Sequence, residues 1–150
     1  MRLSRHFHLS EFLRSQTAAR HGIDMTPTDT VIDELRRLCV DLLEPIRVEF
    51  GPVQITSGYR PYALNRRIGG SPRSAHMAGR AADFVVDVGT VDDVCAWVVQ
   101  SQLPYDQVID EFGQWLHIAT AAPGTHPRYS ALMARRPLVT GSVTYSRWAA

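Results

Sequence analysis

The chain has 150 residues, 45% of them hydrophobic, and a formal net charge of +1. This length and composition predict one domain over residues 1–150, and the near-neutral charge gives no general attraction to nucleic acid. All 16 basic residues are arginine and none is lysine, which excludes a Schiff-base lysine, a Walker-type phosphate lysine and a Ser-Lys dyad.

Signals for secretion, membrane insertion or a disulfide scaffold are weak in this sequence. Residues 1–6 lack the apolar core of a secretory signal, and no run of 18 apolar residues occurs. Cys39 and Cys95 lie inside expected helices without a C-x-x-C spacing, which favours buried free thiols. We therefore expect synthesis in the cytoplasm without a signal peptide and without membrane insertion. We also expect a monomer, although no sequence feature specifies the oligomeric state.

The first half of the chain predicts two helices. Ser10 is placed to cap a helix over about 10–20, with Glu11 favourable near its positive end. A broad apolar face at helical spacing predicts a longer helix over about 30–50, and Pro45 predicts a kink or break inside it.

The second half predicts mainly strands. Thr90 is placed to cap one further helix that ends near Ser101. The expected strands cover residues 53–56, 84–86, 107–112, 115–120 and 142–148. Helices that mostly precede strands indicate an α+β fold, in which N-terminal helices pack on a small antiparallel sheet.

Two histidines and one aspartate form the pattern with the clearest chemistry. His76 and Asp83 are separated by small residues, and His117 follows in a W-x-H sequence. Catalytic zinc usually takes three such ligands and leaves a fourth position for water. Gly79, between the first two ligands, can adopt the positive φ that a tight turn requires. These residues predict a Zn²⁺ site, although each of them alone would more often be a surface, core or turn residue.

The neighbouring motifs strengthen this hypothesis because they form a longer composite pattern. Its parts are S-G-Y-R at 57–60, L-N at 64–65, I-G-G-S at 68–71, S-A-H at 74–76, G-R-A-A-D at 79–83 and W-L-H at 115–117. The pattern resembles the zinc D-Ala-D-Ala carboxypeptidase and peptidoglycan endopeptidase family, in which bacterial and phage members cleave stem peptides of the cell wall. The segment Phe7–Phe12 also resembles the start of compact members, so the resemblance covers about Phe7 to Thr120.

The resemblance implies roles for further residues. Arg60 corresponds to an arginine near the metal that stabilises an oxyanion or a substrate carboxylate, although it could instead be an ion-pair partner within the fold. Ser74 corresponds to a residue that hydrogen-bonds substrate, or it could simply form a turn. Tyr59 and Asn65 are expected to build the loop.

The general base has two candidates in the sequence. If residues 107–112 and 115–120 form a hairpin, a two-residue loop pairs Asp110 with His117, whereas a three-residue loop pairs Ile109 with His117 and places Glu111 on the same face. The resemblance favours Glu111. Many relatives carry an acid three residues before the second histidine, where this chain has Gln114.

Two other classes of function remain open at this stage. The chain could be a non-catalytic zinc-containing module of the same fold that binds peptidoglycan or another partner. It could also bind nucleic acid through a local group of arginines, although such a group is more often a solvated surface or an anion-binding rim; these are Arg60, Arg66, Arg67, Arg73 and Arg80. Other zinc proteases are disfavoured because H-E-x-x-H does not occur.

The expected partner is the peptidoglycan stem peptide. The bond could be D-Ala-D-Ala, L-Ala-D-Glu or the cross-link between stems. The enzyme would act on the wall after release or delivery, or as part of a phage particle, and the setting could be lysis, entry or wall turnover.

Overall fold

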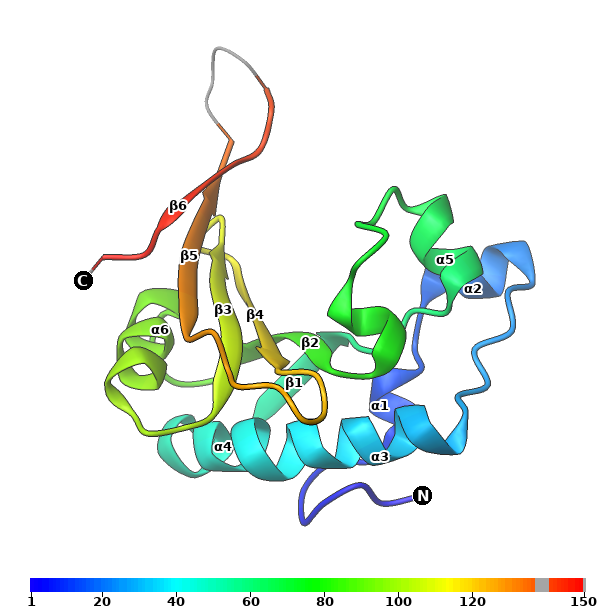
Figure 1. Cartoon of the computed structure of the whole chain (residues 1–150), viewed down its shortest axis with the longest axis horizontal. Coiled ribbons are helices and arrows are strands. Elements are labelled where there is room, and N and C mark those ends of the chain that lie inside the picture. The colour runs from blue at the N-terminus through cyan, green and yellow to red at the C-terminus, as the bar shows by residue number, and fades with distance from the viewer. Residues whose placement is uncertain (137–140, 150) are drawn as a thin grey trace.

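A six-stranded sheet forms the centre of the fold, and helices from the first half of the chain pack along it (Figure 1). The structure, a computed structural model, describes residues 1–136 and 141–149. Its strands are β1 (Val53–Ser57), β2 (Ala81–Val86), β3 (Tyr105–Glu111), β4 (Trp115–Thr120), β5 (Ser130–Arg135) and β6 (Thr144–Arg147). Its helices are α1 (Leu9–Phe12), α2 (Gln16–His21), α3 (Asp29–Leu38), α4 (Glu44–Phe50), α5 (Tyr62–Arg67) and α6 (Val91–Gln100), with a π-helical turn at Cys39–Leu43 and a 3₁₀ helix at Ala75–Ala78.

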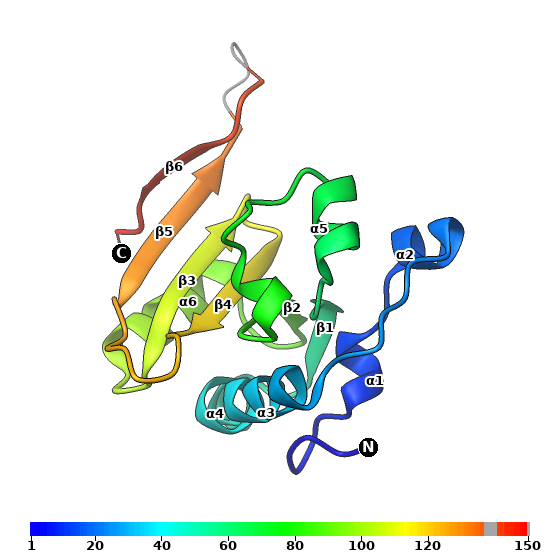
Figure 2. The same ribbon diagram turned by 45° about the vertical axis from the view of Figure 1, so that its right-hand side comes forward.

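The sheet has the order β1-β2-β4-β3-β5-β6, which can be followed from right to left in Figure 2. All neighbouring strands are antiparallel except β3 and β5, which are parallel. The α+β prediction with a mainly antiparallel sheet is confirmed. The sequence prediction missed β5, α5 and the 3₁₀ helix.

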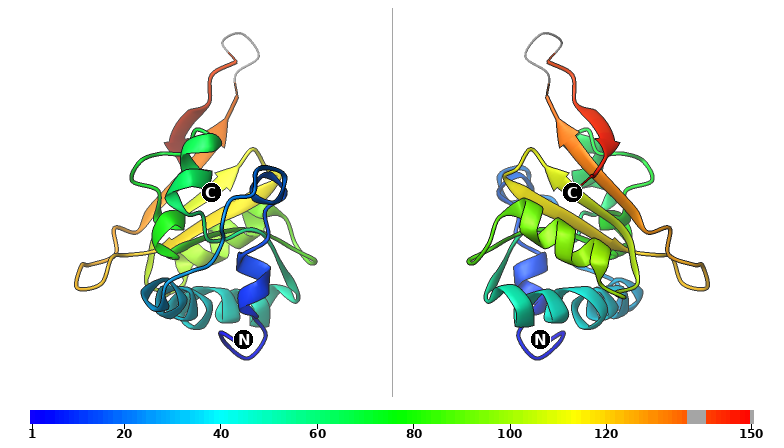
Figure 3. Two further views of the ribbon diagram at one scale, coloured as in Figure 1. Left: turned by 90° about the vertical axis from the view of Figure 1, so that its right-hand side faces the viewer. Right: turned by 90° about the vertical axis from the view of Figure 1, so that its left-hand side faces the viewer.

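Alternation of side chains gives the sheet two different faces. One face is apolar and is covered by α6 and by the α3–α4 pair (Figure 3). Its buried side chains in the central strands include Ala82, Phe84, Val108, Leu116 and Ile118. The opposite face carries the polar residues of the predicted site, and the segment with α5 and the 3₁₀ helix lies over part of it.

The predicted single helix over residues 10–20 is wrong, because the chain forms two short helices there. The N-cap of α1 is His8 rather than Ser10, and the Glu11 carboxylate accepts the backbone N–H of His8 at 2.7 Å. The carbonyl of Phe12, which a continuing helix would use internally, accepts the backbone N–H of Tyr59 at 2.9 Å. Ser15 then starts α2 by accepting the N–H of Ala18 at 3.1 Å.

The long helix over about 30–50 is confirmed, and its irregularity lies just before Pro45. Thr28 caps α3, and the helix passes through the π-helical turn into α4, where Pro45 occupies the first turn. Because proline lacks an N–H and clashes with the preceding turn, a wider turn before it accommodates the ring without ending the helix. One face of this helix is fully buried in the core through five apolar side chains, which are Leu35, Leu38, Leu42, Leu43 and Ile46.

Glu44 anchors the N-terminal arm to this helix. Its carboxylate accepts hydrogen bonds from the Ser4 hydroxyl at 2.6 Å, the His6 backbone N–H at 2.8 Å and His6 Nδ1 at 2.7 Å. Burial raises the pKa of Glu44, but the bonds from His6 and Ser4 outweigh it, and the pKa lies below its ordinary value. The ionised form of Glu44 therefore holds the arm in place.

Cys39 and Cys95 are buried free thiols, as expected. Burial raises the pKa of Cys95 to about 12, which leaves this thiol protonated and unreactive near neutral pH. Among the described residues, none of the helices combines the length and apolar character needed to cross a membrane.

Candidate metal centre

The nitrogen and oxygen atoms of three side chains converge at the polar face of the sheet. His76 Nε2 lies 3.2 Å from Asp83 Oδ1 and 3.3 Å from His117 Nδ1, and the last two atoms are 2.8 Å apart. Each residue can offer one metal-ligand atom to a common point. The structure therefore brings together the three residues predicted as metal ligands.

The sheet register positions two of these residues. Asp83 on β2 lies directly opposite His117 on β4, so both side chains project from the same face. His76 comes from the 3₁₀ helix, which ends at Gly79 with φ of 72°. The positive φ expected at Gly79 is confirmed, and a side chain there would also collide with the backbone oxygen of Val31 at 2.7 Å.

A backbone carbonyl orients the His76 ring. His76 is 1% exposed, and its Nδ1 donates a 2.7 Å hydrogen bond to the Gly58 carbonyl. Because a carbonyl can only accept, Nδ1 carries the proton and Nε2 keeps its lone pair for a metal. Gly58 itself packs so closely on α1 that an added Cβ would lie 2.6 Å from the Phe12 Cα atom.

The electrostatics of the group suit metal ligation. Burial raises the pKa of Asp83, but the adjacent imidazoles of His117 and His76 outweigh this effect and hold the pKa well below its usual range. Burial lowers the pKa of His76, against the opposing influence of Asp83. The aspartate is thus a carboxylate and His76 a neutral imidazole, the protonation states that bind a metal.

The donor set also fits zinc in number and spacing. Zinc binds histidine nitrogen and carboxylate oxygen at about 2.0–2.2 Å in tetrahedral sites, so its ligand atoms lie roughly 3.3 Å from one another. The three separations of 2.8–3.3 Å are close to this value. Three protein ligands leave one tetrahedral position open, which is the arrangement of catalytic rather than structural zinc.

The three ligands lie in a cavity of about 450 Å³. Arg60, Ser74 and Glu111 also line this cavity, so every residue predicted for the site faces the same space. Ser74 precedes the 3₁₀ helix, and its carbonyl accepts the N–H of Met77 at 3.1 Å. Its backbone therefore forms the turn, and the residue also lines the cavity.

The β3–β4 hairpin has the three-residue loop, so the alternative that places Glu111 on the site face is the one observed. Glu111 pairs with Trp115, and Ile109 pairs with His117. Asp110 consequently projects from the other face, where it is 2% exposed. Burial raises the pKa of Glu111; His117 lowers it, and the charges of Asp83 and Asp110 add to the rise. A raised carboxyl pKa suits a group that must take up and release a proton.

Asp110, on the opposite face of the sheet from the metal site, makes hydrogen bonds that stabilise the fold. Its Oδ1 accepts the backbone N–H of Gly113 at 2.6 Å, and Arg135 on β5 donates to both carboxylate oxygens at 3.1 and 2.7 Å. These bonds tie the hairpin loop to the neighbouring strand.

Arg60 is held near the metal ligands without a close ion pair. Its backbone N–H donates to the His76 carbonyl at 3.1 Å, whereas its guanidinium Nη2 lies 3.8 Å from Asp83 Oδ2. The side chain is 16% exposed, and its buried Nε has no hydrogen-bond partner among the described residues. Burial lowers the pKa of Arg60, opposed by Asp83. Arg60 thus lines the cavity without a close ion pair that would occupy its guanidinium.

The loop before the 3₁₀ helix is built by residues predicted for that purpose. Asn65 is 2% exposed, and its Nδ2 donates to the Ser71 carbonyl at 2.9 Å. Gly69 has φ of 71°, and a side chain on Gly70 would collide with the Asn65 amide. Tyr59 is half-buried against the core and holds Phe12 through its backbone.

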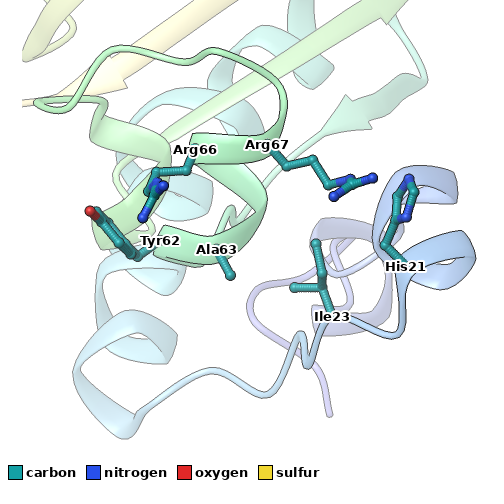
Figure 4. A pocket seen from close by; sticks show the side chains of 6 residues that line it. All are labelled: His21, Ile23, Tyr62, Ala63, Arg66 and Arg67. Atoms are coloured by element: carbon teal, nitrogen blue, oxygen red, sulfur yellow. The ribbon is translucent and has the colours of Figure 1, made fainter.

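The arginines that are close in sequence separate in space. Arg60 and Arg73 line the metal-site cavity. Arg66 and Arg67 instead line a second hollow between α2 and α5, where Arg66 lies over the Tyr62 ring and Arg67 extends toward His21 (Figure 4). This hollow shares no lining residue with the metal-site cavity.

Two site features lacked a sequence signal. The Gly58 carbonyl that orients His76 is a backbone group, and only the adjacent S-G-Y-R motif marks its position. Tyr145, on β6, lines the metal-site cavity although it is far from the other lining residues in sequence.

Comparison with known proteins agrees with this geometry. No curated protein matches the chain. The sequence profile of the family described as Peptidase M15 matches residues 5–119, which include all three metal-ligand candidates and Glu111. Peptidases of this family depend on zinc, and His76, Asp83 and His117 form a group that could hold this metal. The chain belongs to the peptidase M15 family of metallopeptidases.

Proposed function

We propose that this protein hydrolyses an amide bond in the stem peptide of bacterial peptidoglycan. The observation that carries the proposal is the convergence of His76, Asp83 and His117 in a cavity that also holds a partly buried carboxylate, Glu111. A purely structural zinc site would have a fourth protein ligand and no need for such a neighbour. The non-catalytic module is therefore the weaker alternative.

The metal ligands and Glu111 have different proposed roles in the hydrolysis. His76, Asp83 and His117 would hold a zinc ion, which would supply Lewis-acid chemistry toward the scissile carbonyl and water. Glu111 accepts a proton from the attacking water as the oxygen adds to the carbonyl carbon. It then delivers that proton to the amine nitrogen as the carbon–nitrogen bond breaks. The raised pKa of Glu111 favours the first transfer, because it makes the carboxylate a stronger base.

Arg60 is proposed to bind the negative charge that develops on the carbonyl oxygen, or a carboxylate of the substrate. Its 3.8 Å separation from Asp83 contrasts with the 2.7 Å ion pair of Arg135 with Asp110. A guanidinium with unused donors facing a cavity is suited to an oxygen of the substrate. Ser74 is proposed as a further hydrogen-bonding group for the bound peptide.

The same experiment identifies which bond is cleaved: D-Ala-D-Ala, L-Ala-D-Glu or the cross-link between stem peptides. Purified peptidoglycan is digested with zinc-loaded protein, and the fragments are identified by mass spectrometry. We expect one class of stem-peptide bond to be cleaved, and about one zinc per chain by elemental analysis. Intact peptidoglycan after digestion with a fully zinc-loaded protein would contradict the proposal.

A histidine control makes the ligand assignment specific. Replacing His76, Asp83 or His117 by Ala should remove zinc and activity together, because two remaining ligands rarely hold zinc tightly. His21→Ala is the matched control, since His21 is exposed and lines the separate hollow of Figure 4. Full zinc content in His117→Ala would show that the second histidine ligand is misassigned.

Peptidoglycan lies outside the cytoplasmic membrane, so the proposed function includes action there. We propose delivery to the wall in a lysis, phage-entry or wall-turnover setting. Adding the protein to whole cells and to cells with a permeabilised outer surface would compare these settings by the rate of wall digestion.

A further inference from the structure

A row of side chains crosses four strands beside the metal ligands. Register pairing joins Trp115 to Glu111, Glu111 to Ala134, and Ala134 to Tyr145. Residues paired in this way project from the same face of a sheet. Tyr145 therefore stands on the face that carries Glu111 and the metal ligands, and it lines the same cavity.

A small residue stands between Tyr145 and Glu111 in this row. Neighbouring strands lie about 4.8 Å apart, so the backbones of β3 and β6 are separated by roughly 10 Å at this row. Ala134 lies on the strand between them and contributes only a methyl group. No long side chain of this row separates the phenol ring from the carboxylate.

Tyr145 is also unlike the tyrosines that are packed into the fold. It is 57% exposed although it borders a cavity, so its ring lies at the cavity mouth rather than in the core. Burial raises the pKa of Tyr145, and the charges of Glu111 and Asp83 add to the rise. At neutral pH the hydroxyl thus keeps its proton and can donate a hydrogen bond.

The β5–β6 hairpin that carries Tyr145 lies beyond residues 5–119, the part matched by the family profile. The hairpin is joined to the sheet through parallel pairing with β3 and through the Asp110–Arg135 ion pair. Through Tyr145, the hairpin therefore lines one side of the cavity without contributing a metal ligand.

We infer that Tyr145 is a substrate-binding residue, whose hydroxyl donates a hydrogen bond to a carbonyl or carboxylate oxygen of the bound stem peptide while its ring packs on the peptide. The inference rests on the proposed function, because it takes the stem peptide as the occupant of the cavity. Trp115 and Tyr145 then flank Glu111 from opposite sides along the row, and the peptide lies between two aromatic side chains.

The test compares Tyr145→Phe and Tyr145→Ala with the same changes at Tyr129. Tyr129 is the matched control because it is 56% exposed and does not line the metal-site cavity. Its ring packs edge-on against Tyr105, with 5.4 Å between the ring centroids. The substrate is a purified muropeptide with a pentapeptide stem. Kinetics give KM and kcat, and calorimetric titration in a Glu111→Gln background gives the Kd without turnover.

Tyr145→Phe should raise KM and Kd about 5-fold, the effect of one hydrogen bond of roughly 1 kcal/mol. Tyr145→Ala should raise both by about 10-fold or more, because packing is lost as well. We expect kcat within about 2-fold of wild type, unchanged zinc content and an unchanged melting temperature. Tyr129→Phe should match wild type in KM and Kd.

Unchanged KM and Kd in both Tyr145 variants would overturn the inference, and so would a fall in kcat without a rise in KM. In either case the wild-type protein would still hydrolyse the muropeptide, so the proposed function would stand. Absence of both binding and hydrolysis by the zinc-loaded wild-type protein would instead overturn the proposed function together with the inference.

Discussion

Glu111 and Asp110 are adjacent in sequence, yet their replacement should affect different properties of the protein. Glu111→Gln keeps the size of the side chain and removes its ability to accept a proton. We expect turnover to fall by about 10²–10⁴-fold, the usual contribution of a positioned acid-base group. This corresponds to about 3–5 kcal/mol in the activation barrier. Zinc content and thermal stability should stay at the wild-type level.

Asp110→Asn should instead reduce stability. The Asp110 carboxylate is 2% exposed and accepts the Gly113 N–H at 2.6 Å as well as two bonds from Arg135. An amide offers one acceptor oxygen in place of two and turns an N–H donor group toward its partners. Weakening buried bonds of this kind costs about 1–3 kcal/mol. For a chain of this size the melting temperature should fall by about 3–10 °C, with kcat close to wild type.

The assays are steady-state hydrolysis of a stem-peptide substrate, elemental analysis of zinc, and thermal unfolding followed by circular dichroism. Arg135→Met is the matched control, because it removes the other partner of Asp110 and should lower the melting temperature without a loss of turnover. A larger loss of turnover in Asp110→Asn than in Glu111→Gln would refute the assignment of the base. Full activity in both variants would exclude either acid from that role.

Three further predictions concern other parts of the structure. Arg60→Lys should lower kcat/KM by at least about 10-fold at unchanged zinc content, because an ammonium cannot reproduce a planar fork of donors. Equal kinetics in the two proteins would show that Arg60 acts only as a positive charge near Asp83. Gly58→Ala should lower both the melting temperature and the zinc affinity measured by chelator competition, since the added methyl collides with Phe12 and displaces the carbonyl that orients His76; unchanged zinc affinity would contradict that coupling. Glu44→Gln should destabilise the protein at neutral pH: the folded-state pKa of Glu44 is lowered, so its stabilisation is present above the ordinary carboxyl range and disappears as pH falls through the folded pKa. Denaturant unfolding should therefore show the two proteins converging below about pH 4, and a constant difference between them down to that pH would count against the ionised anchor.

Local patterns predicted those parts of the fold that local chemistry determines. The long helix follows from apolar residues at helical spacing, and α6 begins at Thr90, whose hydroxyl accepts the N–H of Asp93 at 3.1 Å. The break between α1 and α2 was missed because its cause is distant in sequence. The Phe12 carbonyl accepts a hydrogen bond from the Tyr59 N–H, and no pattern within residues 10–20 indicates this distant partner.

Tertiary pairing explains the missed strand as well. The β5 segment, S-A-L-M-A-R, has few residues with strong β propensity, and it becomes a strand because β3 offers an edge to pair with. The sequence alone could not decide the register of the β3–β4 hairpin. A two-residue and a three-residue loop are both compatible with the alternation of side chains along these strands. Phe112 at φ of 63° and Gly113 at φ of 66° form the longer loop, closed by the bond from Gly113 to Asp110.

The candidate site was predictable where a side chain's chemistry defines the role. Histidine and aspartate at these spacings indicated the ligand group that the structure brings together at His76, Asp83 and His117. The roles of Arg60, Ser74 and Glu111 stay predictions, although all three face the same cavity. The carbonyl of Gly58 carries no side-chain signal, and Tyr145 reaches the cavity only through strand pairing across β3, β5 and β6.

The pairing of β5 along β3 also protects the protein from self-association. From Gln107 to Glu111, β3 would otherwise present unpaired N–H and C=O groups, an open template for a strand of another molecule. The exposed edge is moved instead to β6, a strand of four residues that includes Arg147, and short charged edges are poor templates. A change that loosens the β5–β6 hairpin would therefore promote aggregation of the protein even where the three metal ligands keep their positions.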